Sequence, residues 1–147
     1  MPQNNKTIFI GSDHAGFSVK ADLIEYLGEL GFKVEDCGAY SAERFDYPLA
    51  AQKVCAGVLE SKAKGILVCG SGIGMSIAAN RFKGIRAALC THEFHARACR
   101  NHNNANIICL GERLTAPAMC RELVKIFLES EFEGGRHEQR VELIEKF

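Results

Sequence analysis

The sequence predicts an α/β fold: a three-layer αβα sandwich built on a five-stranded parallel sheet, Rossmann-like, with strand order 2-1-3-4-5. Two observations carry this prediction. Short apolar runs alternate with helical patterns along the 147 residues, which is typical of a parallel sheet with helices on both faces. Right-handed crossovers then leave few ways to wind the sheet. We treat residues 1–147 as a single domain, as that length allows.

The first half of the chain contains two predicted strands and two predicted helices. A β-rich run over 6–11 breaks into a polar loop at 12–16, and a helical pattern then extends to Gly31. The segment 33–38 is shorter and more polar, so we expect this strand nearer an edge. A second helix starts at about Pro48, which its first turn tolerates, and ends near residue 61.

The second half repeats the pattern. The apolar run 65–69 ends in a glycine-rich turn, and a helix is expected over 75–82. A fourth strand is expected over 85–90, with Thr91 as the N-cap of a helix that ends at 102–104. The fifth strand is expected over 106–110, the next helix over 115–129, and the last helix over about 138–146.

Composition limits the function classes. The formal net charge is zero and there is no basic run, which argues against a nucleic-acid surface. No apolar stretch approaches the roughly 20 residues of a membrane span. The polar start, residues 1–6, has no apolar signal region, so we expect a cytoplasmic protein whose thiols are reduced. Seven cysteines without a Cys-x-x-Cys pair exclude zinc-ribbon and thioredoxin-type motifs, and most are expected to fill the core.

The glycine-rich turn after Cys69 is the predicted reaction centre. Glycines at 70, 72 and 74 allow backbone amides to face one point at a helix N-terminus, an arrangement that binds anions. Cys69 stands beside that positive end, which favours a thiolate. Phosphatase, Walker and dinucleotide motifs all fail here, the first because Met75 stands where it requires arginine. A purely structural turn and a buried core thiol remain alternative interpretations.

The predicted topology brings a second polar loop to the same place. Ligands of such sheets bind beyond the carboxyl ends of the strands, at the switch point between strands one and three. The exits of those strands are Asp13-His14 and Gly70 to Gly74. A ligand role is therefore expected for Asp13 and His14, although they could also be a helix cap and a surface imidazole. Tyr47 could bind a ligand or simply pack.

His102 and three arginines are harder to place. His102 closes a helix at the amino-terminal edge of the sheet, opposite Cys69. It is either a capping histidine at a helix C-terminus or a contributor to a neighbouring subunit's site. Arg136 and Arg140 share one helical face, and Arg113 leaves strand five. These guanidinium groups match phosphate oxygens, or else form a solvated basic face.

The chain resembles the type B ribose-5-phosphate isomerases in six blocks, which lie in the same order over essentially its whole length. The blocks are Gly-Ser-Asp-His-Ala-Gly at 11–16, Asp-Tyr-Pro at 46–48, Cys-Gly-Ser-Gly-Ile-Gly at 69–74 with Ile-Ala-Ala-Asn at 77–80, Gly-Ile-Arg-Ala at 84–87, Arg-Asn-His-Asn at 100–103, and Gly-Gly-Arg-His at 134–137. The family also includes allose- and galactose-6-phosphate isomerases, so the resemblance indicates the reaction better than the sugar.

The resemblance implies an aldose-ketose isomerase of the pentose phosphate pathway. It would act as a homodimer with shared sites, its C-terminal helix (about 137–146) near the interface, and whether dimers pair into tetramers stays open. Cys69 would be the base that moves a proton between C1 and C2, and His102 of the partner subunit would open the sugar ring. The other implied site residues are Asp13 and Ser71 at the sugar hydroxyls or in ring opening, Tyr47 and Asn103 near the sugar, Gly70, Gly72, Ile73 and Gly74 at the enediolate, and His14, Arg113, Arg136 and Arg140 at the phosphate.

Neither a cofactor nor a metal is expected, and the partner would be a small sugar phosphate. Some relatives place a glutamate base where Met75 stands, so the thiol-dependent version of the chemistry is expected. Two other classes remain open: a non-catalytic, flavodoxin-like nucleotide-binding module, and a small regulatory or docking domain.

Overall fold

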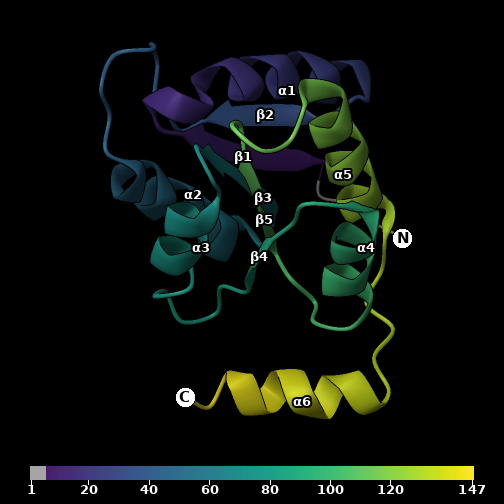
Figure 1. Cartoon of the computed structure of the whole chain (residues 1–147). Coiled ribbons are helices and arrows are strands. Elements are labelled where there is room, and N and C mark those ends of the chain that lie inside the picture. The colour runs from purple at the N-terminus through teal and green to yellow at the C-terminus, as the bar shows by residue number, and fades with distance from the viewer. Residues whose placement is uncertain (1–5) are drawn as a thin grey trace.

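The computed structural model describes residues 6–147, and the start of the polar N-terminal segment, residues 1–5, lies outside the described residues. Figure 1 shows a central sheet between two layers of helices. The strands are β1 (Thr7–Ser12), β2 (Lys33–Asp36), β3 (Lys64–Cys69), β4 (Ala87–Leu89) and β5 (Ile107–Gly111). The helices are η1 (His14–Gly16), α1 (Phe17–Glu29), α2 (Tyr47–Ser61), α3 (Ile73–Ala79), α4 (Glu93–Asn101), α5 (Pro117–Glu129) and α6 (Arg136–Ile144).

The five strands form one parallel sheet in the order β2-β1-β3-β5-β4. The predicted fold class is confirmed, but the predicted order 2-1-3-4-5 is wrong at one side of the sheet. After β3 the chain forms β4 at the edge of the sheet, and β5 then fills the position between β3 and β4. The switch point between β1 and β3 is where the sequence placed it, because β2 and β5 lie on opposite sides of that pair.

Burial explains why β5 lies inside the sheet and β4 at its edge. All five residues of β5 are buried, as in a continuous apolar strand covered on both faces. The three residues of β4 are only half-buried. The strand predicted over 85–90 is limited to Ala87–Leu89, and it pairs with β5 alone.

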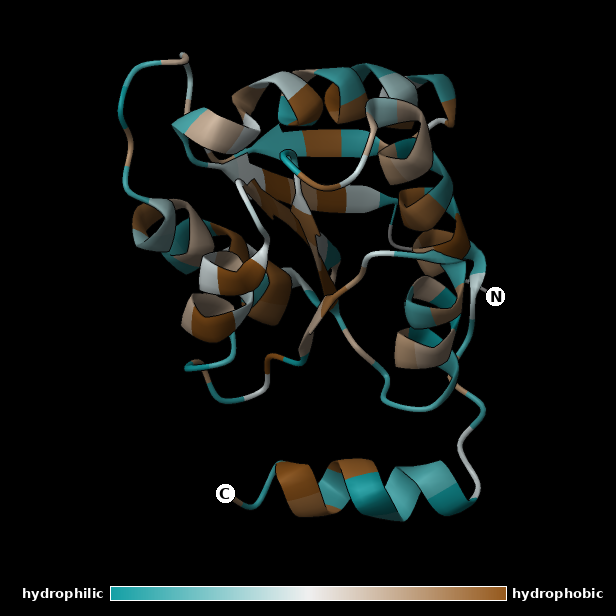
Figure 2. Cartoon of the chain, in the orientation of Figure 1, coloured by the Kyte–Doolittle hydropathy of each residue, from teal (hydrophilic) through white to brown (hydrophobic). Residues whose placement is uncertain are grey.

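Two hydrophobic cores lie on the two faces of the sheet. Helices α1, α4 and α5 cover one face through side chains such as Leu23, Ala96 and Phe127. Helices α2 and α3 cover the other through Val54 and Met75 among others. Figure 2 shows the apolar strands between these layers. Because both faces are covered, polar chemistry is confined to the ends of the strands.

Four helix starts differ from the sequence-based expectations. Helix α5 starts at Pro117, two residues later than expected. The helix after the glycine-rich turn covers Ile73–Ala79 and starts two residues earlier than expected. His92, not Thr91, is the N-cap of α4; the Thr91 hydroxyl instead lies 3.4 Å from Nδ1 of His95. The last helix starts at Arg136, because Gly134 and Gly135 both have positive φ and turn the chain before it.

Helix α6 lies apart from the layered body, below it in Figure 1. Its end is tied to the loop before β4, where Arg86 forms an ion pair with Glu145 and Lys83 donates to the Glu145 carbonyl. The C-terminal half of α6 is apolar in Figure 2, and Leu143, Ile144 and Phe147 are all exposed. In residues 6–147, no helix combines the length and apolar character needed to cross a membrane.

An ion pair between α1 and α5 gives a pH-dependent prediction. Arg121 donates two hydrogen bonds to the Asp22 carboxylate, at 2.9 and 2.7 Å, and these hold the pKa of Asp22 below its ordinary value. Asp22→Asn should lower the free energy of unfolding by no more than about 1 kcal/mol at neutral pH, since the pair is partly exposed.

The contribution of this pair is fully present above the ordinary Asp pKa of about 3.9 and is lost as the pH falls through the lowered folded value. The free energies of unfolding of wild type and Asp22→Asn, measured by urea denaturation, should therefore differ at pH 7 and converge in acid. The exposed pair Lys33–Glu35, 3.8 Å apart, supplies the control Glu35→Gln, for which no comparable change is expected. If the difference in free energy of unfolding between wild type and Asp22→Asn grew in acid, the ion pair would not explain the lowered pKa of Asp22.

Candidate active site

Cys69 ends β3 and lies at the first turn of α3. Its side chain is buried, and its Sγ accepts a hydrogen bond from the Gly72 N–H at 3.2 Å. The Ser71 hydroxyl accepts a similar bond from the Ile73 N–H at 3.2 Å. The Gly72 N–H at the start of α3 therefore points at the sulfur of Cys69. The loop thus contains a nucleophile or base, a hydroxyl and a set of amides.

The other cysteines differ from Cys69 in the direction of their hydrogen bonds. Five thiols donate to backbone carbonyls: Cys37, Cys55, Cys90, Cys99 and Cys120. Burial raises the pKa of Cys55 to about 12 and that of Cys120 to about 11. Cys109 is completely buried in β5. These thiols behave as the core fillers that the sequence predicted.

Close packing explains the three glycines of the loop. Gly72 has φ +82°, and a Cβ there would lie 2.5 Å from Leu89. A Cβ on Gly74 would meet the Tyr47 ring at 2.7 Å, and one on Gly70 would meet the Arg113 guanidinium at 3.1 Å. The glycines therefore admit the side chains of Tyr47 and Arg113 to the loop.

The first loop of the switch point lies directly against the second. The Asp13 N–H donates to the Val68 carbonyl at 3.3 Å, and the buried Asp13 carboxylate accepts the Gly16 N–H at 3.0 Å. Since Val68 immediately precedes Cys69, Asp13 is fixed beside the thiol loop. The prediction that these two loops meet is confirmed.

His14 and Arg113 border the same loop. His14 is exposed, and its Nδ1 accepts the Phe45 N–H at 3.1 Å, which ties it to the segment before Tyr47. The Arg113 N–H donates to the Gly70 carbonyl at 3.0 Å, and its side chain is exposed. One imidazole and one guanidinium thus remain accessible to an anion at the edge of the thiol loop.

The remaining predicted residues lie at the other end of the sheet. His102 is the C-cap of α4 and is half-buried, and Asn103 follows it in an exposed position. Nearby, the Asn106 carbonyl accepts the Gly65 N–H at the start of β3. The four residue steps from Gly65 to Cys69 span roughly 13 Å of strand. Within one chain, His102 and Cys69 therefore belong to opposite edges, as the sequence predicted.

Arg136 and Arg140 belong to the His102 end. Both are exposed on α6. The segment leading to α6 is fastened to the end of α4, where the Glu133 N–H donates to the Asn101 carbonyl at 3.0 Å. The predicted site residues therefore form two groups, one around Cys69 and one around His102.

His137 is a member of the His102 group to which sequence reasoning assigned no role. Its ring stacks on His102 with centroids 4.4 Å apart, and it is buried. Burial and the charge of Arg136 lower the pKa of His137 from its ordinary value. The Gly-Gly-Arg-His block at 134–137 was the available signal, but the stacking depends on the fold.

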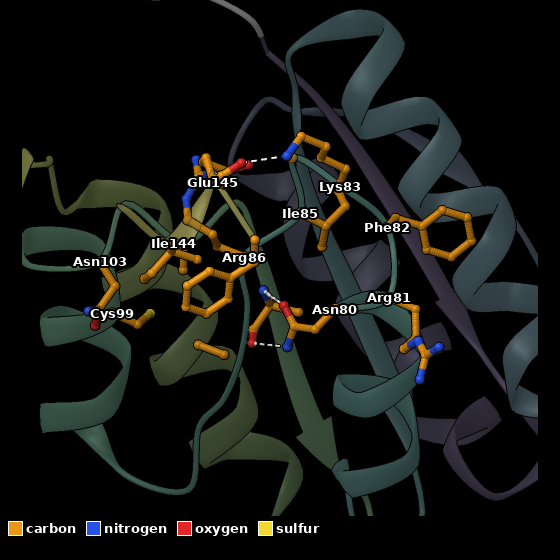
Figure 3. A pocket seen from close by; sticks show the side chains of 15 residues that line it. Asn80, Arg81, Phe82, Lys83, Ile85, Arg86, Cys99, Asn103, Ile144 and Glu145 are labelled. Carbon is orange, nitrogen blue, oxygen red and sulfur yellow. Dashed lines mark hydrogen bonds and ion pairs between the residues drawn. The ribbon is translucent and has the colours of Figure 1, made fainter. Parts of the chain in front are cut away.

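A cavity of about 500 Å³ lies near the His102 group, between the end of α6 and the segment that enters β4. Figure 3 shows Arg86, Ile144 and Glu145 along it. Asn103 also lines this cavity, whereas the thiol loop lies at the opposite edge of the sheet. Ile144 and Phe147 line it at the C-terminal end, and no residue of the thiol loop does, so it is a different feature from the thiol site.

The contact that positions Asp13 can be tested by substitution. A Cβ on Gly16 would lie 2.4 Å from the Val68 carbonyl oxygen, so Gly16→Ala should push η1 away from β3. We expect a loss of about 1–3 kcal/mol in the free energy of unfolding, measured in urea. In the control, Gly28→Ala in α1, the new methyl meets nothing within 4 Å and should stabilise by about 0.5–1 kcal/mol. Equal effects at both positions would contradict the close-contact explanation.

A parallel sheet with a thiol, oriented amides, an imidazole and a guanidinium at its switch point defines an α/β protein of the kind that binds small anionic ligands. The family model described as Ribose/Galactose Isomerase matches residues 8–144. The chain belongs to this family.

Individual relatives agree with this assignment. The chain is 43% identical over 140 residues to ribose-5-phosphate isomerase B of Escherichia coli, covering 95% of this chain and 94% of that protein. A ribose 5-phosphate isomerase from Thermotoga maritima superposes with a TM-score of 0.94 at 49% identity, covering 96% of this chain and 98% of that one. The type B ribose 5-phosphate isomerase of Trypanosoma brucei superposes with a TM-score of 0.93 at 47% identity, covering 97% of this chain and 99% of that one.

Proposed function

We propose that this chain interconverts ribose 5-phosphate and ribulose 5-phosphate by acid–base chemistry that requires neither a cofactor nor a metal. The observation that carries the proposal is the Cys69 sulfur, which accepts a hydrogen bond from the Gly72 N–H beside the oriented amides of the loop. Family membership and the relatives named above support the same substrate class.

The proposed mechanism begins with ring opening. The cyclic aldose must lose its ring before C2 can be deprotonated, and an imidazole whose ordinary pKa lies near 6.5 can transfer the required protons. We assign this step to His102 of the partner subunit, because His102 and Cys69 of one chain lie at opposite edges of the sheet. Asp13 and Ser71 would hold the sugar hydroxyls.

Proton transfer follows from the open aldose. The Cys69 thiolate takes the proton from C2 and returns it to C1, while a second proton passes from O2 to O1. Negative charge develops on the enediolate oxygens between these steps. We assign its stabilisation to the amides at Gly70, Gly72, Ile73 and Gly74, since fixed donors of this kind lower such barriers. The Gly72 N–H, which donates to Cys69 here, and the Ile73 N–H, which donates to Ser71, would turn to the enediolate once substrate is bound.

Phosphate binding would join the two groups of residues. His14 and Arg113 stand by the thiol loop, while Arg136 and Arg140 of the partner subunit would approach from the His102 group together with Asn103. Three guanidinium groups and one imidazole N–H suit the oxygens of a dianionic phosphate. Tyr47, packed against Gly74, would border the sugar.

A homodimer is the assembly that this arrangement requires. The exposed apolar residues Leu143, Ile144 and Phe147 at the end of the chain support an interface near α6. Whether dimers pair into tetramers, and the cytoplasmic location, stay predictions.

The test is incubation of the purified chain with ribose 5-phosphate in the presence of a chelator, with ketose formation followed over time. Rapid ketose formation is expected. Parallel reactions with allose 6-phosphate and galactose 6-phosphate decide between the pentose and the hexose members of the family. Absence of ketose from ribose 5-phosphate would contradict the proposal, and ketose from a hexose phosphate alone would assign the chain to the hexose members.

A further inference from the structure

Glu112 lies where three segments of the thiol site meet, and the proposed mechanism leaves it without a role. It follows β5 directly, and its N–H donates to the Cys69 carbonyl at 2.9 Å. Its side chain reaches α1, where Oε1 accepts the Val19 N–H at 2.9 Å. One residue therefore joins the exits of β5 and β3 to the start of α1.

The hydrogen bond to Val19 supplies a cap that α1 lacks locally. The first N–H groups of a helix have no acceptor within the helix, and an N-cap side chain usually provides one. The N-cap of α1 is Gly16, which makes no such bond. Because Val19 is buried, an unsatisfied N–H there would be costly. Glu112 satisfies it, and the positive end of the helix stabilises the carboxylate in return.

Arg113, the next residue, is directed to the thiol loop. Its N–H donates to the Gly70 carbonyl at 3.0 Å, and a Cβ on Gly70 would lie 3.1 Å from Nη1 of Arg113. The guanidinium therefore lies over Gly70, while the residue stays exposed to solvent. Two neighbouring side chains thus have different surroundings: Glu112 is fixed to α1, and Arg113 is presented to a ligand.

The loop that carries both side chains has little slack. The N–H groups of Leu114 and Thr115 both donate to the Gly111 carbonyl, at 3.1 and 3.0 Å. A Cβ on Gly111 would lie 2.6 Å from the carbonyl carbon of Ser71, so the loop also packs tightly against the thiol loop. A displacement of Glu112 is therefore passed on to Arg113.

We propose that Glu112 is a positioning residue of the phosphate site. Its hydrogen bond to Val19 fixes the loop after β5 and so holds the Arg113 guanidinium where the substrate phosphate can reach it. Glu112 does not bind the phosphate itself, because a carboxylate would repel that anion. The inference rests on the proposed function, in which Arg113 binds the phosphate.

Substitution of Glu112 should change the KM for ribose 5-phosphate more than kcat. We expect Glu112→Ala to raise KM about tenfold and to leave kcat within about threefold, because a phosphate contact is equally strong in the ground state and the transition state. Glu112→Gln should stay within about threefold of wild type in both constants, since its amide oxygen can accept the same N–H.

Asp22→Asn is the matched control for a loosened α1. It breaks the ion pair that joins the other end of the first turns of α1 to α5, and it leaves the loop after β5 untouched. Its KM should stay within about twofold of wild type, as expected for a residue outside the substrate contacts.

A double-mutant cycle shows whether Glu112 acts through Arg113. In an Arg113→Ala background, adding Glu112→Ala should change KM by less than about twofold, because the group that Glu112 positions is already gone. The same cycle is measured on the affinity for inorganic phosphate, followed by ³¹P NMR, which requires no turnover. Circular dichroism shows whether each variant folds. Glu112→Asp, which keeps the charge but shortens the side chain, replaces Glu112→Ala if that variant does not, and should weaken phosphate binding at least about threefold.

Equal losses of phosphate affinity with and without the Arg113 side chain would overturn the positioning role. Wild-type affinity in both Glu112→Ala and Glu112→Asp, or a loss in Glu112→Gln as large as in Glu112→Ala, would overturn it too, as would a wild type that does not bind phosphate. A chain that forms no ketose from any sugar phosphate would defeat the proposed function, but the cycle on inorganic phosphate would still decide the role of Glu112.

Discussion

Cys69→Ala is expected to lower the turnover of ribose 5-phosphate by about a hundredfold to ten-thousandfold, the range typical of a lost general base. Substrate should still bind, because the phosphate and hydroxyl contacts assigned to other residues remain. Turnover is measured by ketose formation, and binding by calorimetry on the inactive variant. A loss in the rate with little loss in affinity would identify the thiol as a reacting group.

Cys37→Ala is the matched control for this experiment. Cys37 is also at the carboxyl edge of the sheet and is half-buried, but its thiol donates to the Glu35 carbonyl, and burial raises its pKa. Its removal should leave turnover within about twofold of wild type, as expected for a thiol outside the reaction. Normal turnover by Cys69→Ala would exclude the thiol as the base.

His102→Ala should impair cyclic and acyclic substrates unequally. Ribose 5-phosphate closes into a furanose, whereas the phosphate on O5 prevents ribulose 5-phosphate from doing so. We expect ketose formation from ribose 5-phosphate to fall about a hundredfold or more. Exchange of the C1 proton of ribulose 5-phosphate with D₂O, measured by NMR, should change much less, because we assign that step to Cys69, acting on an open chain.

His95→Ala serves as the control for His102→Ala, since it removes an exposed imidazole from the same helix. It should leave both measurements near their wild-type values. Equal losses of isomerisation and of C1 exchange in His102→Ala would remove the ring-opening assignment.

Much of the fold follows from patterns that are local in the sequence. The apolar run that ends at Cys69 and the polar loop at Asp13 located the switch point, and β1 and β3 do lie side by side. The order of the last two strands could not be obtained in this way. It depends on how deeply each strand is buried, and β5 outcompetes the three-residue β4 for the internal position.

The candidate site was predictable to a similar depth. Residue types and spacing predicted that Cys69 and its glycine loop form the candidate site. They also predicted that His102 of the same chain lies at the opposite edge of the sheet. They did not reveal that the glycines make room for Tyr47 and Arg113, since that depends on side chains from α2 and from the loop after β5. The stacking of His137 on His102 was likewise invisible, because the two residues are far apart along the chain and meet only where α6 begins beside the end of α4.

The central claim is that two chains share each site, one supplying Cys69 and the other His102. Its most direct test mixes the two inactive variants, Cys69→Ala and His102→Ala, under conditions in which subunits exchange. Random pairing makes half of the dimers mixed, and each mixed dimer contains one complete site, so activity should return at about a quarter of all sites. No recovery, despite mixed dimers confirmed by mass spectrometry, would contradict the shared site.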